Sequence, residues 1–565
     1  MKSLGKIDLR SLALFTVVLI VICIFLVYPV LIVFVDSVII QGRLDLSYLL
    51  SFFADAYYMK CFWNSIILSL VCVATSSLVG VPLAYFLSRY RLPGKTLLTT
   101  ISLMPMIVPP FVGAMAFIFL FGRYGTLNLI LMDWLRVTNE PINLIYGLHG
   151  LVFLETLHLY PLICLNCSAA ITQIDPALEE SAEIEGASGI RRFFTISLPL
   201  ATPGFAAGAF LVFIWTFSDW VTPTIVGLND YLAAQAYADL IQLIDVPRFQ
   251  KGLVACVIVA LFSIVVLVAM RRYVSLKQYV SLTKGVTMEG RVVDIGTRKR
   301  IAAMVFCLAF AGISLLGPVW LVFSAFAKTW KLTPFPTEYT LSNFAFIMSE
   351  TPLFIANTFK FAGVAVLLDL LLGLAVAYLL ARVRPPGENL LDGLITMILA
   401  VPGIVVGVGY LRGFHRLELP LIGDTLTHLW IIMPLVIAIR RVPYVVRSSY
   451  ASLQQMDIAF EEASDILGAS RLQTFLRITA PLIVRGVFAG TVFSFIQGIQ
   501  EVSSTMFLVL PGWETMTIGT FIFFQSSGLF GAAAAIGVVL MAVTALSMLI
   551  SAKLGGRMLG GAFNV

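Results

Sequence analysis

Long apolar runs separated by short polar segments make up most of this chain. The runs lack the period-2 alternation of half-buried strands, so they predict helices. About 20 helical residues cross a bilayer core about 30 Å thick, and backbone groups in lipid need partners within their own segment. We therefore predict an all-α polytopic membrane protein with about twelve spans. The predicted spans lie near residues 12–35, 62–88, 97–121, 143–171, 205–227, 252–271, 302–327, 357–381, 390–413, 428–450, 487–510 and 529–553.

Two of these spans contain helix breakers. The third holds "MPMIVPPFVG", with Pro105, Pro109 and Pro110, and the ninth holds "VPGIVVGVG", with Pro402 and Gly403. Irregular backbone at membrane depth persists only where protein or a water-filled cavity covers it. We expect both segments to line a common pathway.

The composition supports a lipid-embedded chain. Of 565 residues, 59% are hydrophobic and only 12% charged, with a mean hydropathy of +0.96. Soluble domains carry about 25% charged residues, so a soluble protein is excluded. The seven cysteines, including the Cys164/Cys167 pair, fit small packing residues in helices, and no metal or disulfide framework is visible.

Basic residues predict the orientation of the chain. Lys2, Lys6 and Arg10 precede the first apolar run, which is too long for a signal peptide and has no small-x-small cleavage site. If the N-terminus is cytoplasmic and the spans alternate, 24 Lys and Arg fall on the cytoplasmic side and 11 outside. This bias agrees with the positive-inside rule. The net charge of +6 therefore requires no nucleic-acid partner.

The chain also contains an internal repeat. "EGASGIRRFFTISLPLATPG" from Glu185 matches "LGASRLQTFLRITAPLIVRG" from Leu467 at an offset of 282 residues. An earlier block, "LAYFLSRYRLPG", matches "VAYLLARVRPPG" at an offset of 293 and aligns Arg89 with Arg382. Two blocks in one order indicate a duplication, with six spans in each parallel copy. We predict a first repeat at 1–272, a basic cytoplasmic linker at 273–300 and a second repeat at 301–565.

A short cytoplasmic helix is predicted in each repeat, near 176–186 and 458–468. Asp175 followed by Pro176 is typical of a helix start, and acids in the first turns suit the helix dipole. Gly186 and Gly468 are expected to end the two helices. A merely solvated loop would not explain why the glycine, the acids and a later proline recur in both copies.

These stretches resemble the "EAA---G---------I-LP" motif of ABC importer permeases, the membrane subunits of binding-protein-dependent uptake systems. They read "EESAEIEGASGIRRFFTISLP" and "EEASDILGASRLQTFLRITAP", with Ser181 where the second copy and the motif have alanine. The resemblance implies a type I importer fold, in which each short helix is a coupling helix docked on a cytoplasmic ATPase. The coupling residues it implies are Glu179, Glu180, Gly186, Ala187, Glu461, Glu462, Gly468 and Ala469.

The chain resembles a fused pair of permeases, as in the ferric-iron branch and its relatives for thiamine, 2-aminoethylphosphonate, sugar phosphates and polyamines. That resemblance implies a bacterial inner-membrane protein, one copy per complex, with two ATPase subunits and an extracytoplasmic solute-binding protein. No G-x-x-x-x-G-K-[ST] phosphate loop is present, so ATP and Mg²⁺ are expected on the ATPase and no cofactor on this chain. No nucleophile–base constellation indicates an enzyme.

Ionisable residues within spans are candidates for the pathway, since they are costly in lipid. Asp219 and Glu501 correspond at the 282 offset, as do His158 and Arg440. The acids are candidates for transient contact with a cation, although a structural role in hydrogen bonding is the alternative, and no firm metal site is assigned. Further pairing is expected between Glu155 and His158, one turn apart, and between Glu501 and the pair Arg440 and Arg441.

The cargo stays open at this stage. Ferric iron leads on resemblance, whereas Arg440 and Arg441 would suit an anion such as a phosphonate or sugar phosphate, and thiamine and polyamines follow. An ion-coupled secondary transporter with twelve spans is the rival class. The usual loop of that class carries an acid between its second and third spans, but here the loop reads "RYRLPGK".

Overall fold

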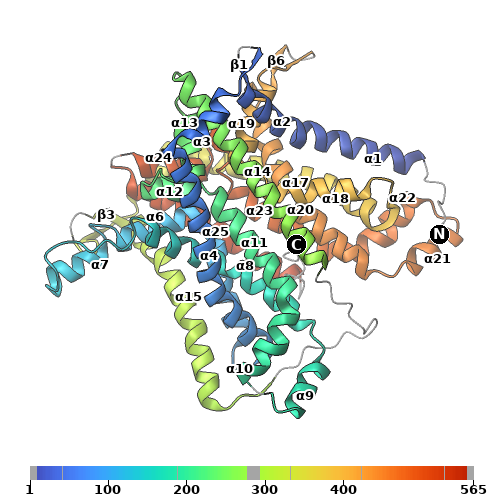
Figure 1. The fold of residues 1–565 in the computed structure, drawn as a ribbon, viewed down its shortest axis with the longest axis horizontal. Coiled ribbons are helices and arrows are strands. Elements are labelled where there is room, and N and C mark those ends of the chain that lie inside the picture. The colour runs from blue at the N-terminus through green and yellow to red at the C-terminus, as the bar shows by residue number, and fades with distance from the viewer. Residues whose placement is uncertain are drawn as a thin grey trace. The chain divides into compact units, whose positions relative to one another are not determined.

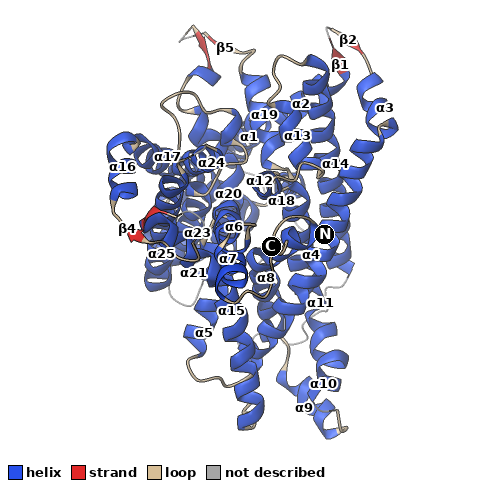
Figure 2. Cartoon of the chain, turned by 90° about the vertical axis from the view of Figure 1, so that its left-hand side faces the viewer, coloured by secondary structure: helices blue, strands red, loops and turns tan. Residues whose placement is uncertain are grey.

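A computed structural model describes residues 9–40, 42–187, 189–276, 293–330, 333–420, 423–526 and 528–555. Most of the predicted linker, residues 277–292, lies outside these ranges. The described chain is almost wholly helical, which confirms the all-α prediction (Figure 2). Its strands form three antiparallel pairs, namely β1 (Ile39–Ile40) with β2 (Arg43–Leu44), β3 (Ala327–Thr329) with β4 (Glu338–Tyr339), and β5 (Glu418–Leu419) with β6 (Asp424–Thr425).

By length and composition, the described residues contain 10 helices able to cross a membrane, or up to 11 if one bent pair is a single span. The bent pair is the ninth predicted span. The remaining predicted span, 428–450, is the 24-residue helix α20 (Ile432–Gln455). This helix is long enough to cross a membrane. It is not among the 10 candidates because Arg440, Arg441 and Arg447 make it more charged than a typical membrane-spanning helix.

The chain forms two compact units. One, called unit 2, comprises residues 50–350 and 520–541. Its helices are α4 (Ala56–Arg89), α5 (Lys95–Leu103), α6 (Pro110–Phe121), α7 (Thr126–Leu129), α8 (Leu148–Thr172), α9 (Pro176–Ile184), α10 (Gly189–Arg192), α11 (Leu198–Ser218), α12 (Val221–Val226), α13 (Leu232–Leu240), α14 (Val246–Leu276), α15 (Thr297–Phe326) and α16 (Ser342–Glu350).

The other, called unit 1, comprises residues 1–49, 351–519 and 542–565. Its helices are α1 (Leu9–Ile22), α2 (Tyr28–Val38), α17 (Pro352–Tyr378), α18 (Glu388–Ala400), α19 (Gly403–Phe414), α20, α21 (Ala459–Ile466), α22 (Arg471–Thr474) and α23 (Ala480–Ile499). The unit boundaries pass through α3 (Ser47–Ala54), α24 (Met516–Gln525) and α25 (Phe530–Gly555). Figure 1 labels these elements along the chain.

Each unit is built on a bundle of three helices, α4–α8–α11 in unit 2 and α17–α20–α23 in unit 1. Glycines bring the backbones close, as small residues do between membrane helices. A Cβ added at Gly80 of α4 would lie 2.8 Å from the Tyr160 carbonyl oxygen, and one at Gly373 of α17 would lie 2.8 Å from Val445. Gly80 and Gly373 are 293 residues apart, so the repeat seen in the sequence is also a repeat of helix packing.

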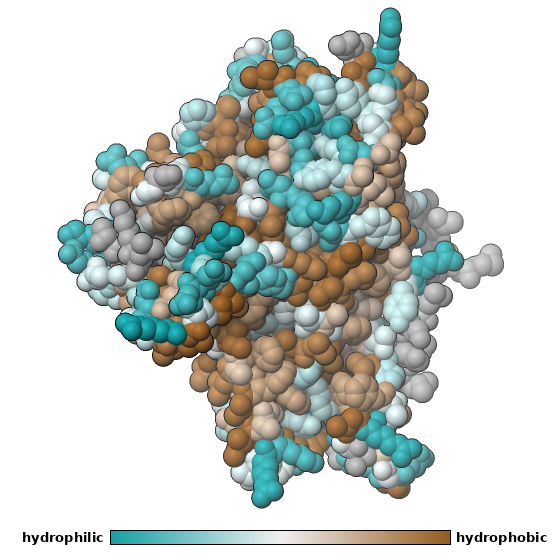
Figure 3. Space-filling view, turned by 60° about the vertical axis from the view of Figure 1, so that its left-hand side comes forward, coloured by the Kyte–Doolittle hydropathy of each residue, from teal (hydrophilic) through white to brown (hydrophobic). Residues whose placement is uncertain are grey.

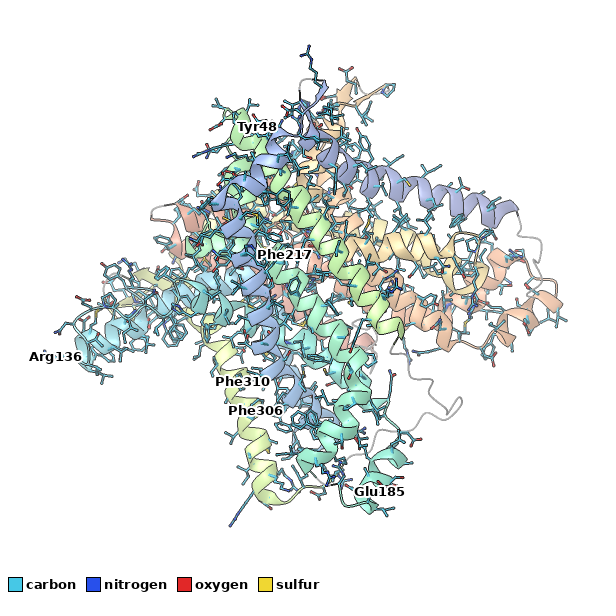
Figure 4. All side chains as sticks on the ribbon, in the orientation of Figure 1. Tyr48, Arg136, Glu185, Phe217, Phe306 and Phe310 are labelled. Atoms are coloured by element: carbon cyan, nitrogen blue, oxygen red, sulfur yellow. The ribbon has the colours of Figure 1, made fainter. Side chains whose placement is uncertain are left out.

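The units differ from the linear halves of the chain, because the first helices of the two repeats are exchanged. In unit 1, α2 packs against α19, where the Tyr28 hydroxyl donates to the Gly413 carbonyl at 3.0 Å. In unit 2, α15 packs against α6 and α4, and the ring of Phe306 lies 5.7 Å from that of Phe86 (Figure 4). The repeat boundaries near 272 and 301 remain a prediction from sequence. The compact units are defined by packing in space and not by similarity between the two halves.

Many large apolar side chains are exposed along the outer faces of the spans, as lipid contact requires. They include Leu78 of α4, Val265 of α14, Val305 of α15 and Leu371 of α17. In the space-filling view, hydrophobic residues cover wide areas of the surface, with hydrophilic patches between them (Figure 3).

Candidate functional site

The short helix α9 begins and ends as its sequence predicts. The Asp175 carboxylate accepts from the Ala177 backbone N–H at 2.9 Å, which caps the helix, and Pro176 occupies the first turn. Gly186 follows the helix with φ +86°, a left-handed conformation that suits glycine. Figure 4 labels Glu185 at this tip, and Glu185 precedes the glycine directly.

The turn after α9 is a Schellman motif, which satisfies carbonyls left free at a helix end. The Ala187 N–H donates to the Ala182 carbonyl at 2.8 Å, and the Gly186 N–H donates to the Glu183 carbonyl at 3.0 Å.

Helix α21 of unit 1 has the same construction. The Asp457 carboxylate accepts from the Ala459 N–H at 3.0 Å. The Ala469 N–H donates to the Ser464 carbonyl at 3.1 Å, and Gly468 has φ +79°. The predicted cap at Asp175 and the predicted glycine turns at Gly186 and Gly468 are therefore confirmed, and Asp457 makes a corresponding hydrogen bond in unit 1.

The first acid of each motif points into the protein. Glu179 is buried, and its Oε1 lies 3.2 Å from Arg89 at the end of α4. The same oxygen accepts from the Ser197 hydroxyl at 2.9 Å. Ser197 belongs to a π-helical turn, Phe193–Ser197, which leads into α11. A buried ion pair thus ties α9 to two longer helices.

The corresponding group recurs in unit 1. The Arg382 Nε donates to Glu461 at 2.8 Å, and the Thr479 hydroxyl donates to Glu461 at 2.8 Å. Arg382 lies in the π-helical turn that extends α17, and Thr479 lies in the π-helical turn before α23. We call each group, Arg89–Glu179–Ser197 and Arg382–Glu461–Thr479, an anchoring triad. The sequence comparison aligned both arginines without giving them a role.

A second set of matched positions faces outward. On α9 and its turn, Ile184 is 88% exposed, and its counterpart Ile466 of unit 1 is 86% exposed. Glu180 and Glu462 are also exposed, whereas Ala187 and Ala469 are half-buried. The further exposed apolar pairs, each at the 282 offset, are Leu178 with Phe460, Ile190 with Leu472, and Phe194 with Leu476. Each unit therefore presents a short, firmly anchored helix whose exposed surface combines acidic residues with an isoleucine and other apolar side chains.

At membrane depth, unit 1 contains a broken helix against a charged cluster. Helices α18 and α19 are bent by 106° at the Pro402 break. A Cβ added at Gly403 would lie 2.6 Å from the Arg440 guanidinium and 2.6 Å from the Ser503 Cβ, so a larger residue would force these groups to shift. A Cβ at Gly407 would lie 2.5 Å from the Ser504 carbonyl oxygen. The break therefore packs directly on α20 and on the unwound chain after α23.

Glu501 is the centre of that cluster. It is buried, and its two oxygens form ion pairs with Arg440 and Arg441. The Ser504 N–H and hydroxyl donate to the same carboxylate at 3.0 and 2.9 Å. The expected pairing of Glu501 with both arginines is present. Both oxygens of the acid are thus paired with arginine, and its role towards a cation stays a prediction.

Unit 2 has the same backbone plan with different chemistry. Asp219 follows α11 as Glu501 follows α23, but its carboxylate accepts from the Val221 N–H at 2.8 Å and from the Thr222 N–H at 3.3 and 3.4 Å. Asp219 thus caps α12 in the structural role that the sequence left as an alternative. The Glu155 side chain is buried and interacts with Asp219.

The expected Glu155–His158 ion pair is absent from the salt bridges of the described residues, because the two side chains have different neighbours. The Pro105 carbonyl hydrogen-bonds His158 instead. Pro105, Pro110 and His158 line a cavity of about 30 Å³, enough for about one water. Within the described ranges, no group of three or more His, Cys, Asp or Glu is placed to hold a metal ion.

Comparison with known proteins agrees with the duplicated plan. A family described as "Binding-protein-dependent transport system inner membrane component" matches residues 76–277 and again residues 369–560. The chain is 26% identical over 538 residues to the ferric transport system permease protein FbpB of Actinobacillus pleuropneumoniae, which covers 93% of this chain and 75% of that protein.

Two further relatives match a single portion of the chain. The molybdenum transport system permease protein ModB of Escherichia coli K12 is 34% identical over 202 residues, covering 34% of this chain and 88% of ModB. The sulfate transport system permease protein CysT of Salmonella typhimurium LT2 is 29% identical over 210 residues, covering 35% of this chain and 76% of CysT. One repeat of this chain therefore corresponds in length to most of such a relative.

Proposed function

Because this chain belongs to the family of binding-protein-dependent transport system inner membrane components, we propose that it forms the translocation pathway of an ATP-driven importer for ferric iron. It is a multi-pass transport protein of the inner membrane. The ferric cargo is proposed from two relatives that match most of the chain and are named for ferric transport, one in Actinobacillus pleuropneumoniae and one in Haemophilus influenzae.

The observation that carries the mechanism is the duplicated construction of α9 and α21. Each has an aspartate that accepts from a backbone N–H of the first turn, a glycine turn, a Glu–Arg pair and an exposed isoleucine. An exposed isoleucine on a rigidly held helix is suited to a partner's groove, since burying it there recovers apolar surface from water. We assign each helix to one copy of a cytoplasmic ATPase, with one copy of this chain per complex.

Force from such an ATPase would reach the membrane through the anchoring triads. Glu179 joins α9 to α4 and to the start of α11, so α9 cannot shift without moving both. Glu461 makes the same links from α21 to α17 and α23. ATP and Mg²⁺ would bind on the ATPase, and a separate binding protein would deliver the cargo from outside. In this arrangement the N-terminus is cytoplasmic.

A second cargo class has one observation in its favour. Arg440 and Arg441 place two cations on a single acid in unit 1, so the cluster has an excess of one positive charge. Relatives named for molybdenum and sulfate transport match part of the chain. An oxyanion is therefore the alternative to ferric iron.

The test is uptake by proteoliposomes containing the chain, its ATPase and its binding protein. We expect ATP-dependent accumulation of ferric iron, with two ATPase copies per chain by mass and no hydrolysis by the isolated chain. Uptake of sulfate or molybdate without ferric iron would favour the anion. ATP hydrolysis by the chain alone would contradict the proposal that a separate subunit hydrolyses ATP.

A further inference from the structure

A cavity of about 650 Å³ lies within unit 2, and its lining includes no residue of α9. It is formed where α6 and α15 end and α25 begins, between Gly122, Ser324 and Phe530. Its volume is within the range of about 300–1,000 Å³ that is typical of small-molecule sites. Neither the coupling role nor the pathway residues involve it.

The lining combines two cations with aromatic and apolar side chains. Arg123 follows the end of α6, and Lys328 lies on β3 just after α15. Lys328 pairs with Glu338 at 2.8 Å, and this hydrogen bond raises the pKa of Lys328, so the lysine stays charged. No ion pair among the described residues involves Arg123, and arginine is always charged in proteins. The remaining side chains in the lining include Ile118, Phe119, Tyr124, Tyr146, Trp330 and Phe530.

Hydrogen bonds hold the wall that carries Lys328. The Asn343 side-chain amide donates to the Ala325 and Ala327 carbonyls, each at 2.9 Å. A Cβ added at Gly531 would lie 2.7 Å from the Asn343 side chain, so the start of α25 packs tightly on this amide. β3 and β4 pair next to it, from Ala327 to Tyr339. The cation therefore projects from a fixed edge of the cavity.

The position of the cavity suggests its occupant. By length and composition, the candidate spans that contain α15 and α25 end at Phe326 and begin at Phe530, while Arg123 and Tyr124 follow the first helix of a third, Pro110–Trp134. The ends of α6, α15 and α25 meet at the cavity, and we take them as the edge of the hydrocarbon. Tyrosine and tryptophan gather at that boundary, here as Tyr124, Tyr146 and Trp330. Phospholipid phosphates lie at the same depth, where arginine and lysine side chains donate charge-assisted hydrogen bonds to phosphate oxygens.

We propose that this cavity binds an anionic phospholipid, with the headgroup phosphate between Arg123 and Lys328 and the upper acyl chains against Phe119 and Phe530. A free inorganic phosphate is fully hydrated and gains nothing from the apolar side of the lining, whereas a lipid uses both sides. Glu338 competes with the phosphate for Lys328.

The test measures lipid retained by the purified chain in its complex, by native mass spectrometry and by titration in nanodiscs of phosphatidylcholine containing phosphatidylglycerol. We expect the double variant Arg123→Gln with Lys328→Gln to bind phosphatidylglycerol about thirtyfold more weakly. Glu338→Gln should bind it more tightly. Arg136→Gln is the matched control, since Arg136 is an exposed arginine of the same unit that does not line the cavity (Figure 4).

Millimolar inorganic phosphate should fail to displace the lipid. Unchanged phosphatidylglycerol binding in a double variant that melts like the native chain would overturn the proposal. Equal losses in Arg136→Gln would also overturn it, since the effect would then be general surface charge. Binding of inorganic phosphate with no preference for phosphatidylglycerol over phosphatidylcholine would replace the lipid site with a free-anion site.

Discussion

The membrane-depth regions of the two units share a backbone plan but differ in charge. In unit 1, Arg440 and Arg441 meet Glu501 beside a helix break. In unit 2, His158 stands where Arg440 does, beside the proline-rich break, and Asp219 caps a helix instead of pairing with a cation.

The regions around α9 and α21 behave in the opposite way. There the backbone, the Arg–Glu pair and even the exposed isoleucine are the same in both units. Two identical partners would require two identical surfaces, whereas residues that contact the cargo can differ between the copies. The two copies are therefore most alike at the proposed ATPase contacts, and they differ among the residues that we expected near the cargo.

The largest effect is expected from Glu501→Gln, which leaves two buried arginines without their acid. Breaking a buried ion pair from one side costs about 3–5 kcal/mol in the free energy of unfolding. Asp219→Asn weakens the bonds to backbone N–H groups but also removes a like charge from beside Glu155, and we expect a loss of about 1 kcal/mol. Thermal melts of the two variants, with uptake assays in parallel, measure the difference. Equal destabilisation would remove the contrast between the units.

A smaller effect is expected from opening the anchoring triads. Arg89→Gln leaves Glu179 buried and unpaired, with side chains that are 2% and 1% exposed in the native pair. Arg382→Gln acts on a pair that is 10% and 15% exposed, so water replaces part of the loss. We expect about 3 kcal/mol for the first and about half of that for the second. Denaturant titration in mixed micelles checks the order, and a larger loss for Arg382→Gln would contradict it.

Removing the hydroxyls of the triads should be milder still. Ser197→Ala and Thr479→Val each delete one donor to a glutamate that keeps its arginine. A single hydrogen bond contributes about 1 kcal/mol. Combined with the arginine variants, these changes should be non-additive, since each triad acts as a unit. A double-mutant cycle measures this, and strictly additive effects would show that the hydroxyl and the arginine act separately.

The smallest effect on stability, with a large effect on assembly, is expected from Ile184→Asp and Ile466→Asp. Both residues are almost fully exposed, so the free energy of unfolding should change by less than about 0.5 kcal/mol. Retention of the ATPase during purification should nevertheless fall, because an acid replaces the apolar contact. The matched control is Ile244→Asp, which is 98% exposed in unit 2 outside α9. Normal ATPase retention in both Ile184→Asp and Ile466→Asp would contradict the proposal that α9 and α21 dock on the ATPase.

Much of this arrangement was predictable from the sequence because it depends on residues close together in the chain. The long apolar runs determine helices, and the aspartate caps and glycine turns of α9 and α21 determine where those helices begin and end. The two offsets, 282 and 293, identify the repeat and the corresponding residues. Each of these features depends on local hydrogen bonding or on simple periodicity.

Only the tertiary structure decided which side chains meet. Glu179 and Glu180 are neighbours in the motif, yet the first is buried on Arg89 and the second is exposed. The sequence suggested His158 as the partner of Glu155, but packing brings Asp219 to it instead. The exchange of α2 and α15 between the units was equally hidden. The physical reason is the same in these three cases. Helix packing determines which side chains on different helices meet, and the sequence pattern of one helix does not identify the helix that packs against it.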